Sequence, residues 1–228
     1  MRAVPRFSMP RMDEFCLDWE RNARCGTCEA VLCEPKSAAQ VDAIVLHALG
    51  LDRRLLLTRL PAAQHAALSA RVRDALDYDP VTRTAMLGNL PAQTSGRVAV
   101  VCGGTSDVPV AGEAARTLAY AGEQATMYTD VGVAGLWRLM ERIDDIRRHR
   151  VVIVVAGMEG ALFSVVAGLV PSAVVALPTS VGYGVAQGGH AALNAALASC
   201  ASGITAVNID NGFGAAHAAL RILGATER

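Results

Sequence analysis

The chain has 228 residues, 21 basic and 21 acidic side chains, and a hydrophobic fraction of 52%. Balanced charge excludes a nucleic-acid binder that relies on a basic surface, and the high apolar content excludes an intrinsically disordered chain. The length suits one large α/β domain, or a compact domain with a smaller unit attached, and the composition is typical of an α/β enzyme.

The first twenty residues mix arginines with carboxylates and hold no apolar stretch that resembles a signal peptide. The segment 151–177 is the one candidate membrane span, but Gly157, Glu159 and Gly160 interrupt it before the roughly 20 apolar residues that a span requires. We therefore expect a soluble, cytoplasmic protein with neither a membrane nor a nucleic acid as partner.

Four of the six cysteines lie close to the start of the chain: Cys16, Cys25, Cys28 and Cys33. A cytosolic setting disfavours structural disulfides. Four thiolates that include a C-x-x-C pair suit zinc or an iron–sulfur cluster. The sequence has no second C-x-x-C pair, so the simpler interpretation is ordinary small side chains in a lead segment, residues 1–35.

Residues 36–90 predict a small α/β unit. Apolar residues at helical spacing indicate a helix over 38–49, and a short apolar run indicates a strand over 54–58. Pro61 opens a second predicted helix, over 61–72, and a further strand is predicted near 76–78. The proline- and glycine-bearing stretch 91–96 predicts a linker.

From residue 97 to residue 228 apolar strands alternate regularly with helices. The predicted strands are 98–102, 125–128, 151–156, 173–177 and 205–208, and the predicted helices are 110–120, 136–147, 161–169, 191–198 and 214–223. Strands that are apolar throughout belong to parallel sheets covered on both faces, so the fold class is α/β with a parallel sheet flanked by helices. Ligands of such sheets bind at the carboxyl ends of the strands.

A double glycine and three polar residues follow the first strand: Gly103, Gly104, Thr105, Ser106 and Asp107. Glycines let a ligand approach the backbone, hydroxyls donate hydrogen bonds, and the next helix presents its N-terminal amides. This pattern predicts a phosphate site. The alternative is a simple turn in which Ser106 or Asp107 caps the helix.

A carboxylate follows the third strand, in Gly157-Met158-Glu159-Gly160. Glu159 is either a general base or a side chain that favours the helix dipole. After the fourth strand, a polar, glycine-rich loop predicts a substrate loop; its candidate residues are Thr179, Ser180, Gly182, Tyr183 and Gly184.

Cys200 follows the fourth helix, and Asn208 and Asn211 follow the fifth strand. Cys200 is either a nucleophile or a buried small hydrophobe, and Asp210 or Asn211 is able to cap the last helix. These residues alone predict an α/β enzyme that binds a nucleotide or phosphate, with its chemistry open.

Five motifs taken in order resemble the LarB family, whose members are relatives of the purine-pathway carboxylase PurE. They are Gly104-Thr105-Ser106-Asp107, Gly157-Met158-Glu159-Gly160-Ala161-Leu162, Pro178-Thr179-Ser180-Val181-Gly182-Tyr183-Gly184, Ser199-Cys200-Ala201 and Asn208-Ile209-Asp210-Asn211-Gly212-Phe213-Gly214. The early segment matches less well. There Glu29, Glu34 and Lys36 agree with the family pattern, whereas Cys28 replaces a proline and Cys33 and Pro35 replace glycines.

The resemblance implies a PurE-like, flavodoxin-like three-layer domain with a small α/β unit before it. It also implies an activity: carboxylation of nicotinic acid adenine dinucleotide at ring carbon C5 by CO2 or bicarbonate, with hydrolysis of the phosphoanhydride to release AMP. The product is pyridinium-3,5-biscarboxylic acid mononucleotide, a precursor of the nickel pincer cofactor. Cys200 would be the nucleophile. Glu159 would be the catalytic glutamate, either as the base in the carboxylation step or as the activator of the hydrolytic water, and a homo-octamer is expected.

In this family interpretation Mg²⁺ neutralises charge at the phosphoanhydride. The binding residues carried over are Gly104, Thr105, Ser106, Asp107, Gly157, Met158, Thr179, Ser180, Gly182, Tyr183, Gly184, Asn208 and Asn211. Two alternatives remain: a PurE-like aminoimidazole ribonucleotide carboxylase or mutase, which needs no cysteine because its substrate is already electron-rich, and a non-catalytic nucleotide sensor or iron–sulfur module.

Overall fold

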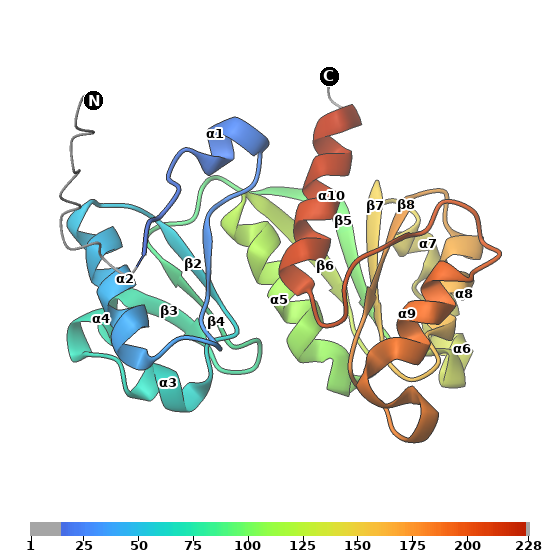
Figure 1. The fold of residues 1–228 in the computed structure, drawn as a ribbon. Helices are drawn as coiled ribbons and strands as arrows, with labels where there is room; N and C mark the ends of the chain where they lie inside the picture. Colours follow the sequence, from blue (N-terminus) through green and yellow to red (C-terminus); the bar gives the residue numbers. More distant parts are fainter. Residues whose placement is uncertain (1–14, 227–228) are drawn as a thin grey trace, which may run out of the picture.

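The computed structural model describes residues 15–226, which form two sheets, each with its own helices (Figure 1). The smaller sheet has the order β1-β2-β4-β3, in which β1 and β2 are parallel and the other pairs antiparallel. Its strands are β1 (Ala30–Leu32), β2 (Leu55–Thr58), β3 (Leu76–Asp79) and β4 (Thr84–Leu87). Its helices are α1 (Arg21–Cys25), α2 (Ala38–Gly50), α3 (Ala62–Ala66) and α4 (Ala70–Ala75).

The larger sheet has five parallel strands in the order β6-β5-β7-β8-β9. The strands are β5 (Thr94–Cys102), β6 (Glu123–Tyr128), β7 (Val151–Ala156), β8 (Ala173–Pro178) and β9 (Thr205–Ala206). The helices are α5 (Val108–Tyr120), α6 (Leu136–Met140), α7 (Ile143–Ile146), α8 (Ala161–Leu169), α9 (His190–Leu197) and α10 (Gly212–Thr226), with 3-10 turns at η1 (Thr105–Asp107), η2 (Val133–Gly135) and η3 (Gly184–Gly189). This strand order is that of flavodoxin-like sheets, so the predicted fold class is confirmed.

The central strand β7 explains the three layers. All six of its residues are buried. Successive side chains of a strand point to opposite faces, so Val151 and Ile153 join the core beneath α5 and α10, and Val152 and Val154 join the core beneath α8 and α9. A strand with no polar face must be covered on both sides, as the sequence predicted.

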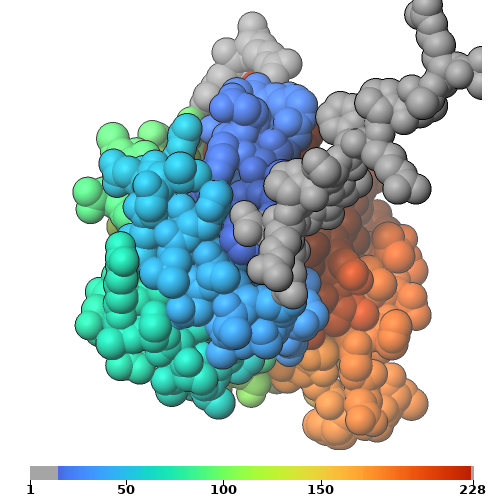
Figure 2. Space-filling view, turned by 60° about the vertical axis from the view of Figure 1, so that its left-hand side comes forward, coloured from blue at the N-terminus to red at the C-terminus, as the bar shows by residue number. Residues whose placement is uncertain are grey.

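The two units meet through a small apolar cluster. Leu56 and Met86 of the small sheet contact Tyr120 of α5, and Phe213 of α10 packs against them. The neighbours of Leu56 in β2, Leu55 and Leu57, point instead into the small unit's own core. The small sheet is therefore covered by its own helices on one face and by α5 and α10 on the other. The two units lie side by side in Figure 1, and the small unit stands in front of the larger one in Figure 2.

The structure differs from the sequence prediction mainly at element ends. The helix expected over 61–72 is two helices, because Ser69 has a non-helical ψ of 150° and its backbone N–H donates to Asp42 Oδ1 at 2.8 Å. The helix expected over 136–147 is likewise divided, with Arg142 at φ −109° between α6 and α7. Strand β1 falls in the expected lead segment, and β5 begins at Thr94, inside the expected linker.

Between residues 15 and 226, no helix has the length and apolar character that a membrane crossing needs.

Two leucines that differ in burial give a matched test of this packing. Leu177 in β8 is fully buried, whereas Leu197 at the end of α9 is 70% exposed. We expect Leu177→Ala to lower the free energy of unfolding by about 2–5 kcal/mol, because it leaves a cavity in the central sheet. Leu197→Ala should change it by less than about 0.5 kcal/mol. Urea unfolding monitored by circular dichroism measures both, and equal losses would contradict the assigned sheet core.

Candidate active site

A cavity of about 330 Å³ lies at the carboxyl ends of β5, β6 and β7. In this strand order β5 has β6 on one side and β7 on the other, and connections leave in opposite directions there, which opens a crevice. Loops that follow four different strands line it, and the main polar or glycine positions are Gly104, Ser106, Asp107, Asp130, Gly132, Arg138, Gly157, Glu159 and Gly160.

Asp107 holds two of these loops together. Its carboxylate is buried, with 5% of the residue exposed. Oδ2 accepts a hydrogen bond from the backbone N–H of Gly104 at 2.9 Å, and Oδ1 accepts one from the hydroxyl of Thr179 at 2.7 Å. Burial raises the pKa of Asp107, and the hydrogen bonds from Thr179 and the backbone oppose that rise. Asp107 thus joins the loop after β5 to the end of β8.

The loop after β7 packs against the backbone of Val181. The backbone N–H of Met158 donates to the Val181 carbonyl at 2.8 Å, and Met158 adopts a left-handed φ of 50°. A Cβ atom at Gly157 would lie 2.1 Å from the same carbonyl oxygen. Only glycine fits there, and the close approach leaves Glu159 exposed at the cavity, directly before the first turn of α8.

The small unit reaches the other side of the loop after β8. Asp210 Oδ1 accepts from the backbone N–H of Ser180 at 2.8 Å, and Arg59 Nη2 donates to the Asp210 carbonyl at 2.7 Å. Arg59 and Arg83 line a cavity of about 110 Å³ together with Ser180 and Asp210. Both arginines adopt a left-handed φ, 50° and 52°, a conformation that costs free energy and is concentrated at functional sites.

The structure brings together one part of the residue set expected from the sequence. Gly104, Ser106, Asp107, Gly157, Met158 and Glu159 all line the 330 Å³ cavity. Thr105, Gly182, Tyr183 and Gly184 lie outside its lining, and Tyr183 is 77% exposed. Thr179 is also outside the lining, and it contacts the cavity wall only through its hydrogen bond to Asp107.

The two asparagines have local partners. Asn211 Oδ1 accepts from the backbone N–H of Gly214 at 2.8 Å and so caps α10. Asn208 Oδ1 accepts from the N–H of the next residue, Ile209, at 2.9 Å. Asn211 therefore acts as a helix cap, one of the two roles expected for it from the sequence.

Cys200 is exposed in the loop between α9 and β9 and is not part of the cavity lining. Its neighbour Ser199 shares a hydrogen bond with Ser164 of α8 at 2.7 Å between the two hydroxyl oxygens. Glu159 lies two residues before α8, so Glu159 and Cys200 are both close in sequence to residues of α8 or to its contacts.

The early cysteines lie in different surroundings. Cys33 is buried in the small unit's core, and Cys28 lies beside His217 with 3.5 Å between Sγ and Nε2. Within residues 15–226, no group of three or more His, Cys, Asp or Glu side chains is placed to hold a metal ion.

Sequence reasoning missed Asp130 and Arg138, which form an ion pair at the cavity wall. Asp130 follows β6, so the rule applied to the other strand ends would have found it. Arg59 carries no comparable signal, because its approach to Asp210 depends on how the two units pack.

Two family models match the chain. The LarB/PurE-like N-terminal domain matches residues 10–89, and AIR carboxylase matches residues 97–228, more than half of the chain. The chain is also 36% identical over 207 residues to an uncharacterized protein of Methanocaldococcus jannaschii, an alignment that covers 87% of this chain and 80% of the relative.

Two glycines offer a matched test of the site's backbone. Gly157→Ala places a methyl group against the Val181 carbonyl, so we expect a loss of about 1–3 kcal/mol in the free energy of unfolding. Gly168, in α8, has nothing within 4 Å of the point where a Cβ atom would lie, so Gly168→Ala should stabilise the protein by about 0.5–1 kcal/mol. Thermal unfolding of both variants measures the two effects; an unaffected Gly157→Ala protein would show that the loop is not constrained by Val181.

Proposed function

The chain belongs to the LarB family of PurE-like proteins, and from that premise we propose that it synthesises pyridinium-3,5-biscarboxylic acid mononucleotide. Its AIR carboxylase domain supports an enzyme of the carboxylase or mutase type. The finer proposal is that nicotinic acid adenine dinucleotide is carboxylated at C5 and hydrolysed at its phosphoanhydride. The observation that carries it is Glu159, exposed at a strand-end cavity beside the Gly104–Asp107 loop, in a chain that has both family domains.

The chemistry explains why a thiol is needed. A pyridinium ring is electron-poor and does not attack CO2 unaided. Addition of the Cys200 thiolate at C4 forms a C–S bond and makes C5 nucleophilic. The C5 electron pair then forms a bond to CO2. Glu159 takes the C5 proton, the electron pair restores the aromatic ring, and the thiolate leaves.

The cavity supports binding of the pyridine mononucleotide half of the substrate. Ser106 lines the cavity with an exposed hydroxyl at the start of a helix, where backbone amides favour phosphate, and Thr105 is exposed beside it, outside the lining. The Asp107–Thr179 hydrogen bond keeps the loop in place. At about 330 Å³ the cavity is at the low end for ligand sites, so the adenylate half extends beyond it.

We propose that Mg²⁺ arrives with the diphosphate of the substrate. Magnesium typically binds through substrate phosphates and one or two carboxylates. The described residues offer no cluster of three ligands, which does not fit a resident ion held by protein alone.

Cys200 must reach a substrate whose ring lies near Glu159. Large apolar side chains are exposed on α6 and in the segment after β8: Trp137, Met140, Tyr183 and Val185. A contiguous patch of exposed apolar side chains marks a subunit contact, and we propose that these side chains form one. We propose that the chain forms a homo-oligomer through this surface and that the substrate meets Cys200 there.

A PurE-like activity on an aminoimidazole ribonucleotide is the second candidate, favoured by the AIR carboxylase match. That substrate is electron-rich and needs no thiolate, so dependence on Cys200 separates the two functions.

Replacement of the proposed nucleophile gives the first test. We expect Cys200→Ala to abolish carboxylation of nicotinic acid adenine dinucleotide and to leave the fold intact, since Cys200 is exposed. Cys16→Ala removes another exposed thiol and should retain full activity. Product formation is followed by liquid chromatography; carboxylation by Cys200→Ala at the wild-type rate would remove Cys200 from the mechanism.

The base is tested separately from the nucleophile. Glu159→Gln should lower turnover by about 10²–10⁴-fold without loss of stability, because the amide cannot accept the C5 proton. Glu141→Gln, also exposed, is the control for loss of charge. Intact-protein mass spectrometry of Glu159→Gln with substrate should show a thiol adduct on Cys200. Unchanged turnover would exclude Glu159 as the base.

A further inference from the structure

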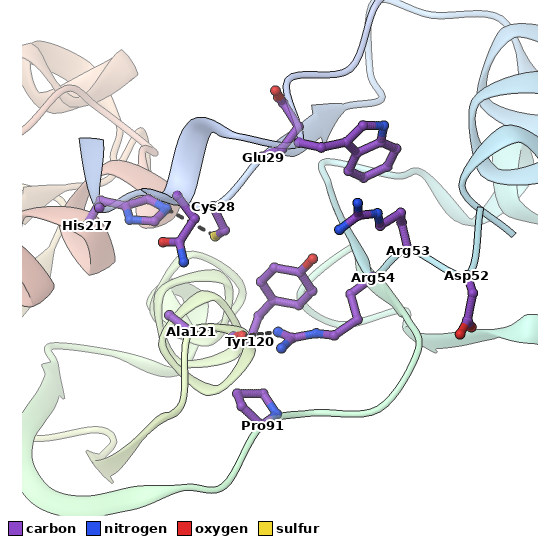
Figure 3. A pocket seen from close by; sticks show the side chains of 12 residues that line it. Cys28, Glu29, Asp52, Arg53, Arg54, Pro91, Tyr120, Ala121 and His217 are labelled. Atoms are coloured by element: carbon purple, nitrogen blue, oxygen red, sulfur yellow. Dashed lines mark hydrogen bonds between the residues drawn. The ribbon is translucent and has the colours of Figure 1, made fainter. Parts of the chain in front are cut away.

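A second and larger cavity, of about 450 Å³, lies where the two units meet (Figure 3). Trp19, Cys28 and Arg53 line it from the small unit, and Tyr120 and His217 line it from α5 and α10. It shares no lining residue with the strand-end cavity. Asp107 precedes α5 and Tyr120 ends it, so the 13 residues of α5 separate the two cavities by roughly 20 Å.

Two guanidinium groups of this cavity lie against aromatic rings. Arg54 stacks on Tyr120, with 4.5 Å from Cζ to the ring centroid, and also donates to the Tyr120 carbonyl. Arg53 lies 6.0 Å from the Trp19 ring centroid and is exposed at the mouth. The cavity thus offers ring faces and positive charge side by side.

The carboxylates of the lining do not neutralise these arginines. Glu29 accepts hydrogen bonds from the backbone N–H groups of Asp18 and Ala30, and its ion-pair partner is Arg21, at 3.6 Å. The Asp52 carboxylate points away from both guanidinium groups (Figure 3). An anionic ligand group would therefore meet unopposed positive charge at Arg53 and Arg54.

One buried histidine, His217, belongs to this lining. It is 6% exposed, its Nε2 faces Cys28 Sγ, and its Nδ1 is buried without a hydrogen-bond partner. Arg54 Nε is also buried and unpaired in the same lining. Burial lowers the pKa of His217 to about 4 and raises that of Cys28 to about 11, so both side chains are neutral near pH 7. Buried polar atoms without partners are uncommon, so this wall of the cavity is an unusual one.

We propose that this cavity binds a nucleoside monophosphate, at a site separate from the strand-end cavity. The phosphate pairs with Arg53 at the mouth, and the base stacks on the Trp19 face. A volume of about 450 Å³ is within the range of small-ligand sites. This ligand contacts both units, so its binding stabilises their packing. The proposal is independent of the function proposed above.

Trp19 gives a direct readout, because the chain has two tryptophans and Trp137→Phe leaves Trp19 as the only one. AMP titrated into Trp137→Phe protein should quench the fluorescence saturably and raise the melting temperature. Adding Arg53→Ala should weaken AMP binding at least about tenfold, because a charge-assisted contact to phosphate is lost. Arg71→Ala, an exposed arginine of α4 outside the cavity, is the matched control and should change nothing.

The comparison ligands and a second variant fix the location. Adenosine and inorganic phosphate should each bind more weakly than AMP, because each lacks one of the two recognised groups. The proposal is overturned if AMP gives no saturable quench up to ~1 mM. It is also overturned if Ser106→Ala in the strand-end cavity abolishes AMP binding while Arg53→Ala leaves it unchanged, since AMP would then occupy the other cavity.

Discussion

Burial of β7 on both faces constrains the arrangement of the larger unit. Because all six of its residues are buried, helices must cover both sides of the sheet, and each connection must cross over to a parallel neighbour. Parallel strands place all their carboxyl ends at one edge. The loops that carry Asp107, Gly157 and Thr179 therefore meet without any sequence proximity, and the Asp107–Thr179 hydrogen bond holds two of them at a fixed distance.

The small unit adds more than stability to this arrangement. Through Leu56 and Met86 it covers Tyr120, and through Arg59 it contacts the carbonyl of Asp210 beside the predicted substrate loop. It also completes the cavity at Tyr120 and His217. The AIR carboxylase family model covers residues 97–228, so these features distinguish the full chain from that domain alone.

The sequence predicted the parallel sheet because β7 and β8 are apolar throughout and their helices follow at once. It predicted the small unit less well. Strand β1 has three residues, of which one is buried, and β4, Thr84–Leu87, contains no β-branched apolar residue, so neither forms the apolar run by which β7 and β8 were found. The Gly104–Asp107 loop and Glu159 were found by the strand-end rule, whereas Arg59 and His217 depend on contacts between units that no local pattern carries.

The most direct test of the proposed activity is to incubate the purified protein with nicotinic acid adenine dinucleotide, ¹³C-labelled bicarbonate and Mg²⁺, and to identify the products by mass spectrometry. We expect AMP together with a pyridinium mononucleotide that carries one labelled carboxylate. Absence of turnover on this dinucleotide, with carboxylation of an aminoimidazole ribonucleotide instead, would contradict the proposal and assign the protein to purine-type chemistry.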